Sequence, residues 1–152
     1  MLKIRTRTAK PAQDRKGAAL VEMALVLPIF CMVVFGIVEF GRAFMVGQLV
    51  TNAAREAVRQ AVTGDYTNSQ VTADVQSFLY DSAKISAADI SVTYTVTPAA
   101  GNPAVAGNEV SNCTSKDLIT IKVSVPFSKV SLLPPSYLKT TAINGQAAMR
   151  FE

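Results

Sequence analysis

The strongest feature of the hydropathy pattern is one long apolar stretch near the N-terminus. Residues 18–40 contain two charged side chains, Glu22 and Glu39, and the sixteen residues from Met23 to Val38 carry no charge. About twenty apolar residues are enough to cross a bilayer as a helix. A lone acid near the end of such a span costs less than one at its centre, where the cost is about 2.5–3.5 kcal/mol. The pattern therefore predicts a transmembrane helix over residues 18–40.

The same helix is expected to start at or just after Gly17 and to continue beyond the membrane. After residue 40 the pattern becomes amphipathic, and no strong stop occurs before Gly64, which is expected to cap the helix. Pro28 lies inside the apolar half and is expected to kink it or loosen a turn. One helix is therefore predicted from about Ala18 to Val62, with residues 41–63 outside the membrane. Its apolar positions in this second half are Val46, Leu49, Val50, Ala53, Ala57, Val58 and Ala61.

Residues 64–152 are expected to form a small head domain. Capping residues at 67–69 predict a second helix that ends near Ala83 and places Val71, Val75, Phe78 and Leu79 on one face. Alternating apolar and polar residues predict strands over 90–96 and 119–125, separated by a long loop over 98–117. With a third strand over 138–151, the fold class is α+β: a long N-terminal transmembrane and amphipathic helix, a second helix, and a small antiparallel sheet of about three strands.

The third strand leaves two alternatives open. Residues 138–151 form one long strand, or Asn144-Gly145 makes a hairpin turn within it. One strand with a bulge is favoured, because short arms of mixed polarity are weak on their own. The expected inward positions of that strand are Ala142, Ala147, Met149 and Phe151.

Charge is concentrated before the apolar stretch. Residues 1–16 hold six Lys and Arg against the single acid Asp14, whereas the rest of the chain holds nine basic and ten acidic side chains. The formal net charge of +4 therefore reflects a basic leader, residues 1–17, and not a basic domain. This distribution argues against nucleic-acid binding. The positive-inside rule places the leader in the cytoplasm and everything after about residue 40 on the outer side.

The composition offers no catalytic or metal-binding arrangement. The sequence has no histidine, which removes the commonest general base and metal ligand. Its two cysteines, Cys31 in the apolar stretch and Cys113 in a polar loop, are not expected to pair with each other. Cys31 is expected to be a small packing residue and Cys113 a free thiol, with pairing between chains as the alternative for Cys113. No enzymatic activity, cofactor or metal is therefore expected.

The boundary between the leader and the apolar stretch contains a candidate processing site. Lys16 and Gly17 precede Ala18, and a glycine allows an extended backbone to enter a protease cleft because it has no Cβ. Cleavage after Gly17 would free the amine of Ala18 and make Glu22 the fifth residue of the shortened chain. Between staggered helices this carboxylate can pair with the N-terminal ammonium of a neighbour and set the stagger. The alternative for Glu22 is an acid favoured by the helix dipole.

Further distinctive blocks follow this motif in a fixed order. After Lys16-Gly17-Ala18-Ala19-Leu20-Val21-Glu22 come ALVLP at residues 24–28, GIVEFGRAF at residues 36–44 and TNAAREAVR at residues 51–59. The first block resembles the processing site of class-III, type IV prepilin-like proteins, and the whole stretch of about residues 15–62 resembles the TadE-like family. The resemblance implies a pilin-like fold and a minor pilin or pseudopilin of a bacterial Tad (tight adherence, Flp) pilus, which takes part in pilus assembly or initiation.

The resemblance also implies residues, partners and a location. Carried over by position, Gly17 precedes the scissile bond, Ala18 becomes the new N-terminus and Glu22 is the acid of the motif. The implied partners are a prepilin peptidase, other Tad pilins and pseudopilins, the inner-membrane Tad assembly platform and the lipid bilayer. The implied location is the bacterial inner membrane, single-pass, with a cytoplasmic N-terminus and a periplasmic head, followed by incorporation into an extracellular pilus. The alternative is an uncleaved single-span anchor that presents an envelope-side binding domain.

Helix packing during assembly has four candidate residues: Glu22, Pro28, Glu39 and Arg42. Glu39 lies where the helix is expected to leave the lipid, and Arg42 follows three residues later. An ion pair at this spacing on an exposed surface contributes only a few tenths of a kcal/mol. The alternative is that these side chains contact another pilin subunit.

Overall fold

The computed structural model describes residues 13–134 and 137–152, with side-chain surroundings from Gly17 onward. Residues 1–12 of the expected leader (residues 1–17) lie outside the described residues. The first helix, α1 (Gln13–Ala61), continues through Pro28 and begins four residues before Gly17. This start is earlier than expected because the residues before Gly17 are compatible with a helix, and an acid such as Asp14 is favoured in a first turn.

Contacts divide the chain into two compact units at Ile37 and Val38. The described part of the first unit is a single helical segment. The second unit, Val38–Glu152, contains the rest of α1, the second helix and a sheet, and it holds the hydrophobic core. In this unit α1 buries the apolar stripe predicted for it, with Ala54 in addition and Leu49 only half-buried. Most of this stripe consists of Ala and Val, and such small side chains allow neighbouring elements to approach α1 closely.

The second helix, α2 (Asn68–Ala83), begins and ends where its sequence signals predict. The Thr67 hydroxyl accepts a hydrogen bond from the backbone N–H of Gln70, and the Gln70 side chain accepts one from the N–H of Thr67, so the two residues form a capping box. At the other end, Lys84 adopts the left-handed conformation that closes a helix. Val71, Val75 and Leu79 are buried as predicted, whereas Phe78 is 42% exposed.

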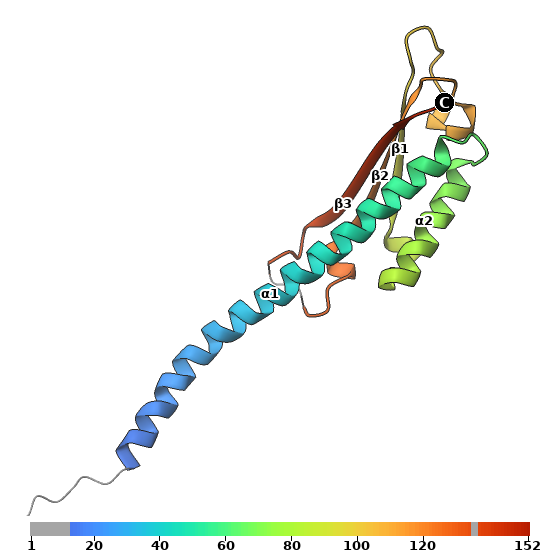
Figure 1. Ribbon diagram of the computed structural model, residues 1–152. Coiled ribbons are helices and arrows are strands. Elements are labelled where there is room, and N and C mark those ends of the chain that lie inside the picture. The colour runs from blue at the N-terminus through green and yellow to red at the C-terminus, as the bar shows by residue number, and fades with distance from the viewer. Residues whose placement is uncertain (1–12, 135–136) are drawn as a thin grey trace, which may run out of the picture. The chain divides into compact units, whose positions relative to one another are not determined.

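The sheet is an antiparallel meander in the order β1 (Ser91–Thr97), β2 (Leu118–Pro126) and β3 (Ala142–Arg150). Figure 1 shows α1 and α2 beside one another on the same side of this sheet. The central strand buries one complete face, formed by Ile119, Ile121, Val123 and Val125. The apolar residues of β1 pair directly with this row, as Val92 does with Val123. Two helices against one face of a three-stranded sheet confirm the predicted α+β fold class.

The third strand is continuous and shorter than expected. Residues 142–150 pair one to one with residues 118–126, so Asn144-Gly145 lies inside the strand and the favoured bulge is absent from it. Ala147 packs against the core, as does Phe151 beyond the strand end. Ala142 is exposed, which corrects its expected inward position, because alternation turns the even-numbered residues of this strand away from the helices. Met149 faces the same side as Ala147 but remains 44% exposed.

Gly145 is explained by the close approach of α1 to β3. A Cβ atom on Gly145 would lie 2.6 Å from the backbone nitrogen of Thr51 and 2.6 Å from the carbonyl carbon and oxygen of Val50. These are backbone atoms within a helix, so they cannot move aside as the end of a flexible side chain would. Glycine inside a strand often marks a place where another backbone comes close. The dipeptide that suggested a turn therefore serves helix-to-sheet packing.

The long loop between β1 and β2 is held by a buried carboxylate. Asp117 accepts hydrogen bonds from the side chain of Asn102 at 2.7 Å and from the backbone N–H groups of Ala99 at 2.8 Å and Thr114 at 2.9 Å. These donors, with Asn102 first among them, hold the pKa of Asp117 well below its usual range, so the carboxylate stays ionised. The neighbouring Cys113 is buried and free, and burial raises the pKa of its thiol. A protonated, buried thiol is a poor partner for a disulfide between chains.

Replacing Gly145 with alanine is expected to destabilise the second unit. The added Cβ would force α1 away from β3, and overpacking of this kind costs about 1–3 kcal/mol. The measurement is chemical denaturation of the detergent-solubilised protein, followed by the near-UV circular dichroism of its tyrosines.

Gly41→Ala is the matched control for this substitution. A Cβ on Gly41 meets nothing within 4 Å, and alanine is favoured over glycine inside a helix by about 0.5–1 kcal/mol. Gly41→Ala should therefore leave stability unchanged or raise it slightly. Equal stabilities for the two variants would contradict the close packing of α1 on β3.

Candidate functional site

The N-terminal half of α1 has the composition of a membrane span. The helical stretch Gly17–Ala61 contains an apolar window of mean hydropathy 2.5, long and apolar enough to cross a membrane, and none of that window is buried in the protein. The exposed apolar side chains lie on all sides of the helix, as expected for a segment that faces lipid or other helices and not the core of its own chain. They include Leu20, Leu25, Ile29, Phe30, Met32 and Ile37, which are 60–71% exposed. This half of α1 is compatible with a membrane anchor.

The candidate processing motif lies at the start of this span. The backbone of Lys16 and Gly17 is helical. Gly17 is exposed, and a Cβ on it would meet nothing within 4 Å. The surroundings of the Lys16 side chain lie outside the described residues. Ala18 and Glu22 are exposed, and a spacing of four residues places them on one face of the helix. Among the residues that the structure describes, Glu22 has no hydrogen bond or ion pair. Pro28 is exposed one to two turns further along.

Glu39 is the second acid of the apolar stretch, and its environment differs from that of Glu22. It is 8% exposed, and its Oε1 atom accepts hydrogen bonds from the backbone N–H groups of Tyr137 at 3.0 Å and Leu138 at 2.7 Å. A buried carboxylate needs such donors, because desolvation without them costs several kcal/mol. The aromatic ring of Tyr137 also stacks on Phe40, with 6.2 Å between ring centroids. Glu39 therefore fixes the connection between β2 and β3 against α1.

Arg42 makes a similar connection one turn further along α1. Its Nε donates to the carbonyl of Val130 at 2.9 Å, and one terminal nitrogen donates to the carbonyl of Ala83 at 3.4 Å. The expected ion pair between Glu39 and Arg42 is replaced by these contacts with the backbone. The ion pairs recorded among residues 18–134 and 137–152 are Arg59–Glu56 and Lys129–Asp89. The spacing of three residues suggested an ion pair between Glu39 and Arg42. Sequence spacing gives no information about backbone groups about ninety residues away, and these are the groups that both side chains bind.

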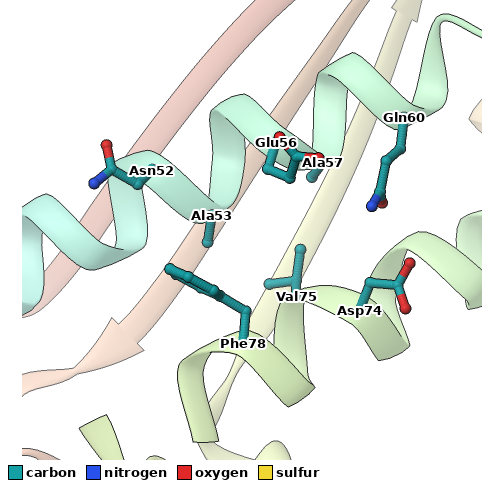
Figure 2. Close-up of a pocket in the computed structure, with 8 residues that line it drawn as sticks. All are labelled: Asn52, Ala53, Glu56, Ala57, Gln60, Asp74, Val75 and Phe78. Atoms are coloured by element: carbon teal, nitrogen blue, oxygen red, sulfur yellow. The ribbon is translucent and has the colours of Figure 1, made fainter. Parts of the chain in front are cut away.

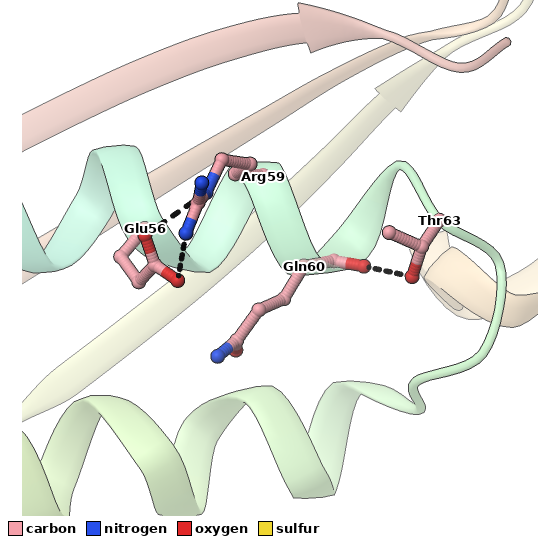
Figure 3. A network of polar contacts seen from close by, with 4 residues as sticks. All are labelled: Glu56, Arg59, Gln60 and Thr63. Carbon is pink, nitrogen blue, oxygen red and sulfur yellow. Dashed lines mark hydrogen bonds and ion pairs between the residues drawn. The ribbon is translucent and has the colours of Figure 1, made fainter.

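A hollow of about 510 Å³ lies between α1 and α2. Figure 2 shows Val75 and Phe78 of α2 pointing toward α1, with polar side chains around them. Two carboxylates line it, and one of them, Glu56, is already paired with Arg59 at 2.9 Å (Figure 3). Such a set of residues supplies neither a nucleophile nor a general base with an orienting partner. Its lining residues are Asn52, Ala53, Glu56, Ala57, Gln60, Asp74, Val75 and Phe78.

The end of α1 is also held by exposed local contacts. Figure 3 shows Arg59 against Glu56 and the Thr63 hydroxyl donating to the carbonyl of Gln60, at 2.8 Å. Glu56 and Arg59 are 52% and 71% exposed at their side chains. Exposed pairs of this kind contribute little to stability. These contacts therefore finish the helix and do not form a site.

Residues 17–59 match the TadE-like protein family. The match confirms the resemblance stated from the sequence. The TadE-like family is associated with Tad pili and is a structural, non-enzymatic kind of protein. No significant match to the chain was found among curated proteins or among solved structures.

The TadE-like segment does not include the whole second unit. It begins at Gly17 and ends at Arg59 on α1. It therefore includes Glu22, Pro28, Glu39 and Arg42 but none of α2 or the sheet. The family match accounts for the helix, whereas the backbone groups that bind Glu39 and Arg42 lie outside it.

Glu39→Ala is expected to release the β2–β3 connection from α1. The substitution leaves the N–H groups of Tyr137 and Leu138 without their carboxylate, and a lost buried hydrogen-bond partner costs about 1–3 kcal/mol. Amide hydrogen exchange should accelerate at both residues. Glu39→Gln keeps an acceptor oxygen and should retain most of the protection.

Glu56→Ala is the control for Glu39→Ala. It removes an exposed acid from the same helix, and stability should change by less than about 1 kcal/mol. Unchanged exchange at Tyr137 and Leu138 in Glu39→Ala would contradict the anchoring function assigned to Glu39.

Proposed function

We propose that the protein is a minor pilin or pseudopilin of a Tad pilus, which a prepilin peptidase processes after Gly17. The observation that carries the proposal is the position of Gly17 and Glu22. They stand at the start of an exposed apolar helix, inside a segment that matches the TadE-like family. The second unit serves as the head, and the function is structural.

Processing would take place where Gly17 interrupts good helix formers. The peptidase needs an extended backbone in its cleft, whereas the bond after Gly17 lies within α1. Glycine costs a helix about 1 kcal/mol relative to alanine, so local unwinding is easiest at this position. Lys16 supplies positive charge on the leader side of the bond, and Ala18 would become the new N-terminus.

Glu22 would act after cleavage. It is exposed on an apolar helix, and among the described residues it has no partner, so its carboxylate is available to another chain. In a poorly solvated bundle a lone carboxylate is expensive, and the new ammonium of Ala18 on a neighbouring chain would neutralise it. The contrast with Glu39 supports this function, because Glu39 is satisfied within its own chain.

The proposed location is the bacterial inner membrane, with the N-terminus in the cytoplasm and the head in the periplasm. The proposed partners are the peptidase, other Tad pilins and pseudopilins, the assembly platform and the bilayer, and the protein would later enter an extracellular pilus. Pro28, Glu39 and Arg42 stay candidates for packing between subunits, although the contacts of Glu39 and Arg42 within the chain favour a structural function for both. The alternative, an uncleaved single-span anchor, requires the helix but neither Gly17 nor Glu22.

N-terminal sequencing of the membrane-extracted protein tests the processing step. In cells that contain the peptidase the mature chain should begin at Ala18, and in cells without it the residues before Ala18 should remain. Gly17→Leu should block cleavage because a bulky side chain fills the cleft, whereas Gly36→Leu, placed inside the span, should be cleaved normally. An uncleaved wild-type chain in peptidase-containing cells would favour the single-span anchor instead.

Glu22→Ala tests the stagger function separately. The variant should be cleaved, since the bond after Gly17 is intact, but pilus assembly should be strongly reduced because neighbouring helices lose their charge pair. The amount of assembled pilus is measured by electron microscopy and by the yield of sheared pili. Glu56→Ala, which removes an exposed acid elsewhere on α1, is the control, and normal piliation in Glu22→Ala would rule out the pairing.

A further inference from the structure

One end of the second unit carries a cluster of exposed apolar side chains, which we call the basal patch: Phe40, Phe44, Leu132, Leu133 and Tyr137. Phe40 and Phe44 are 45% and 74% exposed and lie four residues apart, on one face of α1. Leu132, Leu133 and Tyr137 are 70%, 42% and 49% exposed in the connection between β2 and β3. Large exposed apolar side chains gathered at one end of a folded unit mark a contact with a protein or a membrane.

Specific contacts hold the two parts of the basal patch together. Arg42 binds the carbonyl of Val130, and Glu39 binds the N–H groups of Tyr137 and Leu138, so the connection is attached to α1 on both sides of the leucines. Tyr137 stacks on Phe40. In Figure 1 the connection between β2 and β3 lies beside α1. A buried carboxylate and an arginine thus hold two exposed leucines in a fixed position, which indicates that these leucines make a contact outside the chain.

The charges near the basal patch are mainly basic. Lys139 follows the bound segment directly, and Lys84 follows Ala83, whose carbonyl accepts from Arg42. Lys129 lies at the start of the connection and pairs with Asp89 at 3.2 Å. On the last turn of α2, Asp81 adds one exposed acid. With Glu39 occupied by backbone donors and Lys129 paired with Asp89, the remaining exposed charges named here are Lys84, Lys139 and Asp81, which leaves a small excess of positive charge.

We propose that the basal patch is a second membrane contact, inserted at the level of the lipid headgroups. The proposal rests on the membrane anchor in the proposed function and adds a part of the head to it. Along the chain, Phe40 is the last residue of the apolar stretch over residues 18–40, so the patch begins where the stretch that suits lipid ends. Tyrosine prefers the membrane interface, and lysines near it favour anionic headgroups.

A lipid occupant explains the combination better than another protein subunit does. Leucine side chains beside an amphipathic tyrosine and flexible lysines match the change in polarity from the acyl chains to the headgroups. The leucines can enter the acyl region, while tyrosine and lysine place their polar groups at the headgroups. The cores of protein interfaces are instead depleted in lysine. The patch would also limit tilting of the head relative to the bilayer, since it gives the head a contact in addition to the helix.

Single tryptophans give a direct test, because the chain contains none. The full-length protein carrying Tyr137→Trp is reconstituted in vesicles of phosphatidylcholine and phosphatidylglycerol, with and without lipids brominated along the acyl chain. The proposal expects a blue-shifted emission and a loss of intensity with the brominated lipid. In the same protein, Leu132→Ser together with Leu133→Ser should reduce that quenching, because the leucines hold the patch in the bilayer.

Two further variants make the result decisive. Tyr66→Trp reports from beyond the other end of α1, roughly 33 Å along the helix from Glu39, and should not be quenched. Phe30→Trp reports from the span itself and should be strongly quenched.

Quenching at residue 30 but not at 137 would overturn the basal contact while leaving the anchor intact. Absence of quenching at residue 30 as well would refute the anchor and the basal contact together. If residue 137 became shielded only after partner pilins were added, the patch would be a subunit interface and the proposal would be wrong.

Discussion

A single helix has to satisfy two environments, and the rest of the structure depends on how it does so. From Ala18 to Val38, α1 is apolar apart from Glu22 and mostly exposed, which suits lipid or a bundle of similar helices. From Val46 onward it turns a stripe of small residues toward the sheet and α2. The small side chains of this stripe allow β3 to approach the helix backbone at Gly145. The second unit therefore packs around the C-terminal part of a helix whose N-terminal part belongs to the first unit.

The two acids of the apolar stretch show the physical difference between these environments. Glu39 is buried within its own chain and receives two backbone N–H groups, so its charge is compensated locally. Glu22 is exposed on the apolar half and has no partner among the described residues. An acid that is expensive in lipid and unsatisfied within the chain is consistent with a contact made between chains. The proposed pairing with the amine of Ala18 would supply that contact.

The sheet and α2 pack against the second half of this helix, and polar contacts hold the connections between the strands. Asp117 closes the long loop between β1 and β2, and Glu39 and Arg42 of α1 attach the β2–β3 connection. The match to the TadE-like family ends on α1, so the surface of the head is the part of the molecule about which the family says least. The basal patch belongs to this surface, and it links the head to the same membrane that the helix is suited to enter.

The sequence by itself determined the elements, because each rests on local periodicity and capping. The apolar span, the capping box of Thr67 and Gln70 and the alternating strand at 119–125 are all visible in short windows. Only the tertiary structure decided the meaning of Asn144-Gly145, since a turn dipeptide and a close helix contact look alike without the partner backbone. It also decided the partners of Glu39 and Arg42, which lie too far along the chain for any spacing rule to find. Local patterns encode local structure, whereas contacts between distant backbone groups depend on how the elements pack.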